Sequence, residues 1–542
     1  MTDIEIPLGK RSPKYRFFEM LPAILSYSML LLPVVLSIIS PLWAAVFIIV
    51  YIISWLVRAL GMAFRTIQGY GALEQAKRVD WGVRLKDIED LSTMPDHARG
   101  WRAAEHIKAL RRISRNPSEY FKPSQIYNVV IIAIYNENRD VLEPTIKAVL
   151  ASDFPNKKQT ALFIAYEERG GVAAESMVKD LLAQYSDGFL HAEACKHPAN
   201  ISGEVIGKGG NITWTGRRVQ AWAEETAIPP DKVIVTTLDS DNRPHPSYFS
   251  NLVYEFIVHP DRKYLAFQPI ALFLNNIWDV PAPMRVIATG NSFWTIINSF
   301  RPHMLRNFAA HSQGLSALID TDFWSVRTIV EDGHQFWRSY FRYDGRYDVV
   351  PILIPIYQDA VLSYSLRRTL KAQFIQLRRW AYGASDIAYV AWLGFRKNRT
   401  VPLLNVIAKF IRLVDGHVSW ATASVILTFG AWAPLLINPQ ASRSIIAHQL
   451  PGLASQLQRI AMVGIFITIF LAFRMLPPRP MRYKRRRTIW MILQWGLMPV
   501  VSLIYASAAS LYSQTRLLLG KYLDKFDITD KAVVKHKTSV FK

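Results

Sequence analysis

Two aspartates at the end of an apolar stretch are the residues whose types and spacing most directly suggest chemistry. Residues 233–235, Val-Ile-Val, are typical of a buried strand, and the strand leads into Asp239-Ser240-Asp241. Two carboxylates one residue apart can share a divalent cation such as Mg²⁺ or Mn²⁺, whose other ligands are often phosphate oxygens. Solvated turn acids show the same spacing, but the buried strand favours a metal–diphosphate site at Asp239 and Asp241.

Polar clusters also follow two earlier apolar runs, residues 127–135 and 161–166. They are Asn136-Glu137-Asn138 and Glu167-Glu168-Arg169. Helical spacing between the runs predicts an α/β domain whose mostly parallel sheet is covered on both faces. Ligands of such sheets bind beyond the carboxyl ends of the strands, so Glu137, Glu167 and Asp239 are expected near one site.

A glycine-rich stretch, Gly207-Lys208-Gly209-Gly210-Asn211, is expected to form a loop before the acidic strand. Its glycines permit close approach of another backbone, and Lys208 could contact a phosphate. The stretch lacks the spacing of a Walker loop, and the same residues also fit a plain flexible turn.

A second acidic pair, Glu331-Asp332, follows the segment 315–327, which is mixed enough in polarity to line a cleft. A carboxylate at this place could serve as a general base. The pair also fits the cap of a helix.

The segment 360–389 has the pattern of an amphipathic helix that is too polar to cross a bilayer and is expected in the interface plane. Gln376, Arg379 and Trp380 fall on one of its faces. An arginine can hold a diphosphate with two hydrogen bonds, and an indole can stack on a sugar ring. Arginine and tryptophan at this place also fit a simple interfacial anchor.

The apolar residues are concentrated in blocks, which predicts a membrane protein with a large polar insert. The chain has 542 residues, of which 51% are hydrophobic. Blocks long enough to cross a bilayer are 17–40, 42–64, 417–437, 453–473 and 488–512. The single cysteine, Cys195, excludes an intrachain disulfide and a cysteine metal cluster.

The formal charge of +22 is explained by the flanks of these blocks and does not require a nucleic-acid partner. Four cations precede the first block and seven lie in the segment 474–487, which holds no acid. By the positive-inside rule, both flanks and the central domain are expected on the cytoplasmic side of the cell membrane. The last block either crosses or turns back near Pro499, and the lysine-rich tail favours the second, with the tail inside.

Together these motifs resemble the membrane-embedded family 2 glycosyltransferases, the cellulose, chitin and hyaluronan synthase type. The resemblance covers roughly residues 120–395 and the flanking spans, with the motifs in the family's order. It implies a GT-A-type nucleotide-sugar-binding domain inserted between N- and C-terminal transmembrane helices. The expected regions are an N-terminal hairpin, a helical collar at the membrane surface, a donor-binding core, an acceptor region, a C-terminal membrane region and a basic tail, at 1–65, 66–125, 126–300, 301–400, 401–520 and 521–542.

The resemblance also implies a role for each motif. Asp332 would be the catalytic base. The donor would be bound by Glu137, Glu167, Lys208, Asp239, Asp241 and Arg379. The acceptor would be bound by Trp380, Gln376 and Glu331. Asp239 and Asp241 would hold Mg²⁺ or Mn²⁺. The chain departs from the family at Glu167-Glu168, where an aspartate pair is usual, and at residues 311–314, His-Ser-Gln-Gly, in the acceptor loop.

The implied activity is inverting transfer of a sugar from a nucleoside diphosphate, most often a UDP-sugar, to a growing glycan by a processive synthase. Transfer of one sugar to a lipid acceptor is an alternative. A transporter or a non-catalytic scaffold is a third. A transporter should carry ionisable residues inside its spans, whereas Arg58, Asp415 and His417 lie only at the edges of the predicted ones.

Overall fold

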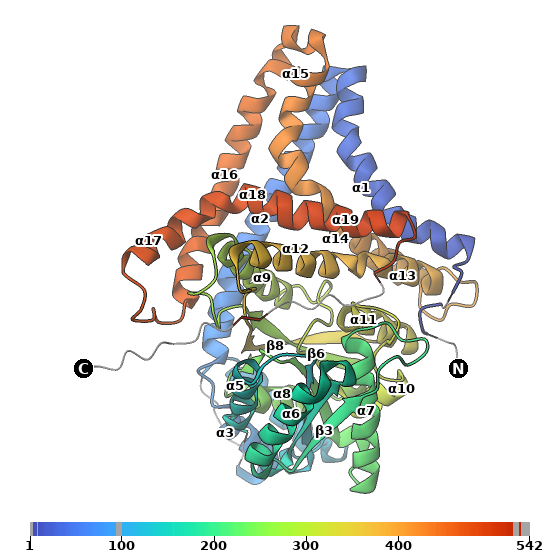
Figure 1. The fold of residues 1–542 in the computed structure, drawn as a ribbon, viewed down its shortest axis with the longest axis vertical. Coiled ribbons are helices and arrows are strands. Elements are labelled where there is room, and N and C mark those ends of the chain that lie inside the picture. Colours follow the sequence, from blue (N-terminus) through green and yellow to red (C-terminus); the bar gives the residue numbers. More distant parts are fainter. Residues whose placement is uncertain (1–3, 8, 94–99, 155–156, 524–530, 533–542) are drawn as a thin grey trace.

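The molecule has three layers, seen in the computed structural model in Figure 1. The structure describes residues 4–7, 9–93, 100–154, 157–523 and 531–532. Long helices stand upright at the top, a layer of helices lies across the middle, and an α/β domain fills the bottom. The upright helices are α1 (Pro13–Ile39), α2 (Pro41–Ala76), α14 (Leu403–Phe429), α15 (Ala433–Ile437) and α16 (Ile445–Met475).

Five helical segments are long and apolar enough to cross a membrane, as the sequence predicted. Four of them are the upright helices, with α14 and α15 forming one segment, Leu403–Ile437. The fifth, Arg486–Leu518, instead runs crosswise beneath them as α17 (Arg486–Leu493), α18 (Met498–Val501), a π-helical stretch (Ser502–Ala508) and α19 (Ala509–Leu518).

The prediction that this last segment turns back near Pro499 is therefore wrong. Polar residues bind it along the neighbouring helix α12 (Leu366–Ala381): the Tyr505 hydroxyl donates to the Leu370 carbonyl over 3.3 Å, and the Ser513 hydroxyl to the Arg378 carbonyl over 2.5 Å. These side-chain hydrogen bonds hold the segment in the middle layer.

The α/β domain contains one mostly parallel sheet, as predicted. Its strand order is β3-β2-β1-β4-β7-β6-β8-β5, and β5 and β7 pair antiparallel to their neighbours. In chain order the strands are β1 (Tyr127–Ile134), β2 (Thr160–Glu167), β3 (His191–His197), β4 (Val233–Asp239), β5 (Arg243–Pro244), β6 (Leu265–Leu272), β7 (Ser312–Gly314) and β8 (Asp348–Tyr357). Because β1 pairs parallel to β2 and β4, the carboxyl ends of these three strands lie at one edge.

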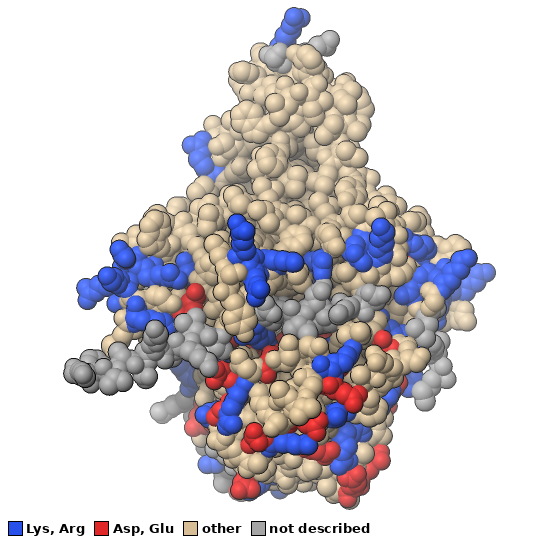
Figure 2. Space-filling model, in the orientation of Figure 1, with Lys and Arg blue, Asp and Glu red and all other residues tan. Residues whose placement is uncertain are grey.

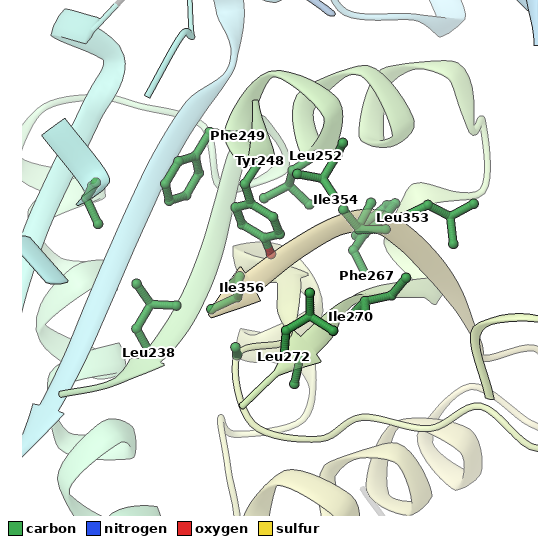
Figure 3. Close-up of a cluster of buried hydrophobic side chains, with 14 of the residues drawn as sticks. Leu238, Tyr248, Phe249, Leu252, Phe267, Ile270, Leu272, Leu353, Ile354 and Ile356 are labelled. Atoms are coloured by element: carbon green, nitrogen blue, oxygen red, sulfur yellow. The ribbon is translucent and has the colours of Figure 1, made fainter. Parts of the chain in front are cut away.

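Both faces of this sheet are buried, which explains why its strands are continuous apolar runs. Figure 3 shows one core, in which Leu238 of β4 and Phe267 of β6 pack with Tyr248 of helix α8 (Tyr248–Val258). The opposite face of β1 packs on helix α7 (Lys208–Glu225). The remaining helices around the sheet are α5 (Arg139–Leu150), α6 (Gly171–Tyr185), α9 (Ala282–Ser299), α10 (Leu315–Asp320) and α11 (Glu331–Arg342). Helix α13 (Asp386–Gly394) lies in the middle layer, where it contacts α1 and α14.

The region 66–125, expected as a collar, is helical as α3 (Trp81–Glu89) and α4 (Ala103–Arg115). Trp81 is buried, and its ring packs against Tyr254 of α8 with 5.2 Å between the ring centroids. The His106 ring of α4 lies 3.0 Å from the Tyr254 hydroxyl. These contacts place the collar on the α/β domain, at the far end of α2.

The amino-terminal residues are fixed on the α/β side of the middle layer. The Tyr389 hydroxyl donates to the Ile4 carbonyl over 2.6 Å, and the Ser325 hydroxyl donates to the Glu5 carboxylate over 2.7 Å. Arg327 donates to the Ile6 carbonyl over 2.7 Å. The segment before the first span is thus part of the folded domain.

Residues 531 and 532 of the carboxyl-terminal tail lie on the α/β side. Lys531 pairs with Leu362 as a parallel bridge, and the Ala532 amide donates to the Leu362 carbonyl over 2.9 Å. This pairing holds Leu362 in extended backbone. The predicted helix 360–389 is accordingly wrong at its start, because α12 begins only at Leu366 and ends before α13.

Candidate active site

Lys208 joins the two acidic motifs that the sequence singled out. Its ammonium lies 2.9 Å from Asp239 Oδ1 at the end of β4 and 3.4 Å from Asp332 Oδ2 at the start of α11. The expected loop around Lys208 is wrong, because Lys208 is the first residue of helix α7. The Lys208 ammonium could therefore contact a phosphate bound at the N-terminus of this helix, where the backbone amides also favour anions.

The glycines after Lys208 are required by close packing. A Cβ on Gly209 would lie 2.4 Å from the Ser325 carbonyl oxygen, and one on Gly210 would lie 2.6 Å from Glu204 Oε2. The Asn211 side chain donates to the Ala165 carbonyl of β2 over 3.0 Å. The Lys-Gly-Gly-Asn stretch therefore seats the first turn of α7 against the edge of the sheet where the ligand is expected.

The charges at this edge shift one another's protonation. Burial lowers the pKa of Lys208, but Asp239 and Asp332 outweigh it and raise that pKa above its usual value. Burial raises the pKa of Asp239, but Lys208 and other cations bring it to about 2. Burial and the neighbouring Asp332 raise the pKa of Glu331 to about 8. At neutral pH the site thus holds an ionised Asp239 and a largely protonated Glu331.

Asp241 is held by two groups that the sequence did not suggest. Its Oδ2 accepts from the Asp359 amide over 3.0 Å, and its Oδ1 lies 2.9 Å from the ammonium of Lys531. The same ammonium lies 2.9 Å from the Ser240 hydroxyl. Burial and the charge of Asp241 raise the pKa of the Asp359 carboxyl to about 6. In the sequence Lys531 is one of six lysines of the tail, so no pattern distinguished it.

His311 borders the Asp332 carboxylate. Its Nδ1 lies 2.9 Å from the Phe308 carbonyl and 3.7 Å from Asp332 Oδ1, and its Nε2 accepts from the Trp324 indole over 3.1 Å. Burial lowers the pKa of His311, which favours the neutral ring. Residues 312–314 of the motif 311–314, expected in an acceptor loop, instead form the short strand β7.

The acids after β1 and β2 are engaged by nearby residues. Glu137 accepts from the Tyr135 amide over 2.8 Å and from the Ser240 hydroxyl over 3.2 Å, which places it beside the Asp239-Ser240-Asp241 motif. Glu167 Oε2 lies 2.6 Å from the Arg169 guanidinium and 3.2 Å from His197 Nδ1.

His197 extends this second cluster to Glu204, with 3.0 Å between its Nε2 and the carboxylate. Burial lowers the pKa of His197, but Glu167 and Glu204 outweigh it and raise that pKa to about 9. The cluster after β2 therefore neutralises its own charges.

The three candidate residues of helix α12 have different neighbours. Arg379 is close enough to lower the pKa values of Asp239 and Glu331 by its charge. The Trp380 ring packs on Phe273, with 6.2 Å between the ring centroids. Gln376 accepts a hydrogen bond from Gln373 over 3.0 Å. Among the described residues, no hydrogen bond joins Gln376 to Asp239, Asp241 or Asp332.

The residues at the end of β4 fit a divalent cation only as a pair of carboxylates. No group of three or more His, Cys, Asp or Glu side chains suited to a metal occurs in the described part of the chain. Mg²⁺ and Mn²⁺ commonly take one or two carboxylates and complete their shell with substrate phosphates and water. Asp239 and Asp241 match that donor set, and the ammonium of Lys531 against Asp241 marks a place that attracts a cation.

Comparisons with known proteins give distant similarities. No protein-family model matches the chain, and no curated protein matches its sequence. A mannosyltransferase from Pyrobaculum calidifontis, solved with GDP-Man and Mn²⁺, is 14% identical with a TM-score of 0.40, over 85% of this chain and 100% of that one.

Residues 1–349 of S. aureus TarS with UDP-GlcNAc are 11% identical with a TM-score of 0.35, over 75% of this chain and 95% of that one. GalNAc-T7 with UDP, GalNAc and Mn²⁺ is 10% identical with a TM-score of 0.31, over 54% of this chain and 58% of that one. At these identities and TM-scores the similarities support no inference about the activity of this chain.

Proposed function

We propose that the chain is a membrane-bound, inverting glycosyltransferase that moves a sugar from a nucleoside diphosphate to a growing glycan. The observation that carries the proposal is the bridge from Lys208 to Asp239 and Asp332. It brings a candidate donor site at the end of β4 and a candidate base at the start of α11 within reach of one ammonium. The proposal assigns the donor, the base and the acceptor to three parts of this one edge of the sheet.

The donor diphosphate is proposed to bind between Lys208 and Arg379. Both are cations beside Asp239, and the ammonium of Lys208 lies at the first turn of α7. Fixed cations at this place stabilise the negative charge that grows on the departing nucleoside diphosphate. A divalent cation held by Asp239 and Asp241 would add Lewis-acid stabilisation of the same charge.

Asp332 is proposed as the base that takes the proton of the acceptor hydroxyl as its oxygen attacks the anomeric carbon. One attack on the face opposite the leaving group gives inversion. Asp332 suits this role because it is partly exposed, whereas Glu331 beside it is buried. With its pKa raised to about 8, Glu331 is largely protonated at neutral pH and is a poorer base.

The acceptor is proposed to reach this edge from the middle layer. Trp380 lies on α12, between the α/β domain and the upright helices, and an indole there can stack on the acceptor sugar. Repeated addition at this place would feed the product toward the upright helices, since a sugar cannot cross hydrocarbon unaided. This arrangement favours chain extension over a single transfer.

The experiment that tests the proposal supplies purified full chain in detergent with radiolabelled UDP- and GDP-sugars, one at a time, in the presence of Mn²⁺. A long polymer is expected with one donor. If the product is instead a lipid that carries one sugar, the enzyme transfers a single sugar and does not extend a chain. No turnover with any donor and acceptor would overturn the enzyme assignment. Asp332→Asn, prepared in parallel, controls for contaminating activity.

The proposed orientation places the α/β domain in the cytoplasm and is tested at Met481, a fully exposed residue of the loop between α16 and α17. Met481→Cys, in a background with Cys195→Ser, should resist an impermeant thiol reagent in intact cells and react after lysis. Labelling of intact cells to the same extent would reverse the orientation.

A further inference from the structure

A pocket lined by basic side chains lies outside the candidate active site. It is lined by His303, Arg306, Phe336, Trp337, Lys409 and Arg412, and is here named the basic pocket. His303 and Arg306 follow α9, the two aromatic residues belong to α11, and Lys409 and Arg412 belong to α14. The pocket therefore forms where the α/β domain meets an upright helix.

Aromatic rings hold two of the cations in place. The guanidinium carbon of Arg306 lies 4.7 Å from the centroid of the Trp337 ring. The ammonium of Lys409 lies 5.1 Å from the centroid of Phe336 and 5.0 Å from that of Tyr340. Cation–π contacts orient a cation without neutralising it, so the positive charge of both groups stays available.

No carboxylate pairs with these cations. Within the described ranges, none of His303, Arg306, Lys409 and Arg412 forms an ion pair or a hydrogen bond with an acid. Two acids act on these cations by their charge alone: Asp386 on Arg306 and Asp348 on Lys409. The Asp386 carboxylate lies 2.7 Å from His334 Nδ1.

The charges in the basic pocket also act on one another. Partial burial and the positive charge of Arg412 lower the pKa of His303. Burial lowers the pKa of Arg306 to about 10, which still leaves its guanidinium charged at neutral pH. Cations that repel one another and form no ion pair with an acid among the described residues form a binding place for an anion.

The surroundings of the basic pocket identify the class of anion. Lys409 and Arg412 lie near the start of α14, which continues into a segment apolar enough to span a membrane. Leu404 and Ile411, which belong to the same part of α14, are exposed. In Figure 2, Lys and Arg side chains form a belt between an apolar upper part and a lower part of mixed charge. A lipid with its headgroup at this belt of cations would have its acyl chains along the apolar surface of the upright helices.

The size of the basic pocket excludes a large soluble ligand. The space that it encloses is about 10 Å³, room for no more than about one water molecule, so a ligand would contact these cations from the surface. We propose that the basic pocket binds the phosphate of an anionic phospholipid, with Arg306, Lys409 and Arg412 as its cationic partners. This site is distinct from the proposed donor site and does not depend on the glycosyltransferase proposal.

Native mass spectrometry of the full chain in detergent tests this proposal, with dioleoylphosphatidylglycerol and dioleoylphosphatidylcholine titrated separately. The wild type should bind the anionic lipid more tightly than the zwitterionic one. The double variant Lys409→Gln/Arg412→Gln should weaken binding of the anionic lipid about tenfold or more. Lys397→Gln/Arg399→Gln removes the same charge from exposed residues just before α14 and should leave that affinity within about twofold of the wild type.

Three results would overturn the proposal: equal wild-type affinity for the two lipids, equal losses in the two double variants, or displacement of the lipid by inorganic phosphate at matching concentration. The last result would assign the pocket to a soluble phosphate. If the pocket double variant does not fold, Arg412→Gln alone decides, because Arg412 is exposed. A folded Arg412→Gln with unchanged affinity for the anionic lipid would also contradict the site.

Discussion

The clusters at the ends of β2 and β4 look alike in sequence but differ in where their partners come from. At the end of β2, Glu167 pairs with Arg169 and His197, from the same strand end and the next strand. At the end of β4, Asp239 and Asp241 pair with Lys208 and Lys531, the first residue of a helix and a residue of the tail.

This difference indicates which cluster can give up its ion pairs when a ligand binds. Arg169 is two residues from Glu167 and His197 is on the adjacent strand, so their pairing persists whenever the sheet is folded. Lys208 and Lys531 reach the end of β4 from other elements, on long side chains that can turn to an arriving phosphate. We therefore expect substitutions at the β4 end to affect chemistry and substitutions at the β2 end to affect mainly stability.

The largest effect is expected for Asp241→Asn. It should lower turnover by ~10³-fold or more, because the Lewis-acid stabilisation supplied by a bound cation is worth several kcal/mol in the transition state. Mn²⁺ binding, measured by electron paramagnetic resonance, should weaken while the circular dichroism stays unchanged. Full activity of the wild type in excess chelator would remove the metal from the proposal.

Asp332→Asn should lower kcat by ~10²–10⁴-fold, the usual contribution of a general base. Donor affinity should change little, since Asp332 is proposed to act on the acceptor. Arg379→Ala is the matched comparison and should weaken donor binding as well as slow the reaction. Single-turnover rates and donor binding constants separate the two. A variant Asp332→Asn with near-normal kcat would transfer the base to another carboxylate.

Lys531→Gln tests directly whether the partners at the β4 end are exchangeable. The substitution removes the ammonium that now lies against Asp241, so affinity for Mn²⁺ should rise, by about tenfold if one cation contact within ~4 Å is lost. Lys535→Gln, in the same tail, is the control for charge alone. Unchanged Mn²⁺ affinity in Lys531→Gln would show that this ammonium does not compete with a metal.

Glu167→Gln should have a smaller kinetic effect. Because Glu167 is already paired with Arg169 and His197, donor KM is expected to rise by less than ~10-fold, with kcat retained. Steady-state kinetics with the preferred donor measures both. A larger rise in KM would place Glu167 directly on the nucleotide, as the sequence resemblance implied.

The smallest expected effect is on thermal stability and belongs to His197. A histidine whose pKa is raised to about 9 contributes stability below its unfolded pKa of about 6.5, and this contribution is lost as the pH rises through about 9. Tm of the wild type should therefore fall between about pH 7 and pH 9.5, by an increment of about 2–4 °C. Glu204→Gln, which removes one partner of His197, should show less of this fall.

The strands around the site could be predicted from the sequence, whereas its cations could not. The strands β1 and β2 were predicted to within one residue at each end, and β4 begins at Val233 as predicted, because burial on both faces makes them uninterrupted apolar runs. The start of α7 was missed because Gly209 and Gly210 are poor helix formers, and the close contacts that require them are visible only in three dimensions.

The role of Lys531 also could not be predicted, because its contacts are visible only in three dimensions. Its partner Asp241 is 290 residues away in the chain, and no local pattern marks one lysine of a basic tail as the one that reaches a carboxylate. Asp239, Asp241 and Asp332 were found because each motif is local. The rule that the carboxyl ends of parallel strands share one edge placed Asp239 near Glu137 and Glu167. The bridge from Lys208 to Asp239 and Asp332 was not predicted.

The docking of the first residues has a consequence for how the protein is made. Ser325, Arg327 and Tyr389 hold residues 4–6, at sequence separations of 320, 321 and 385 residues. Residues 4–6 therefore cannot make these contacts until the chain has been synthesised as far as Ser325, Arg327 and Tyr389. Contacts of such long range form late and slow folding. During synthesis the α/β domain must consequently complete its fold after residues 4–6 have already left the ribosome.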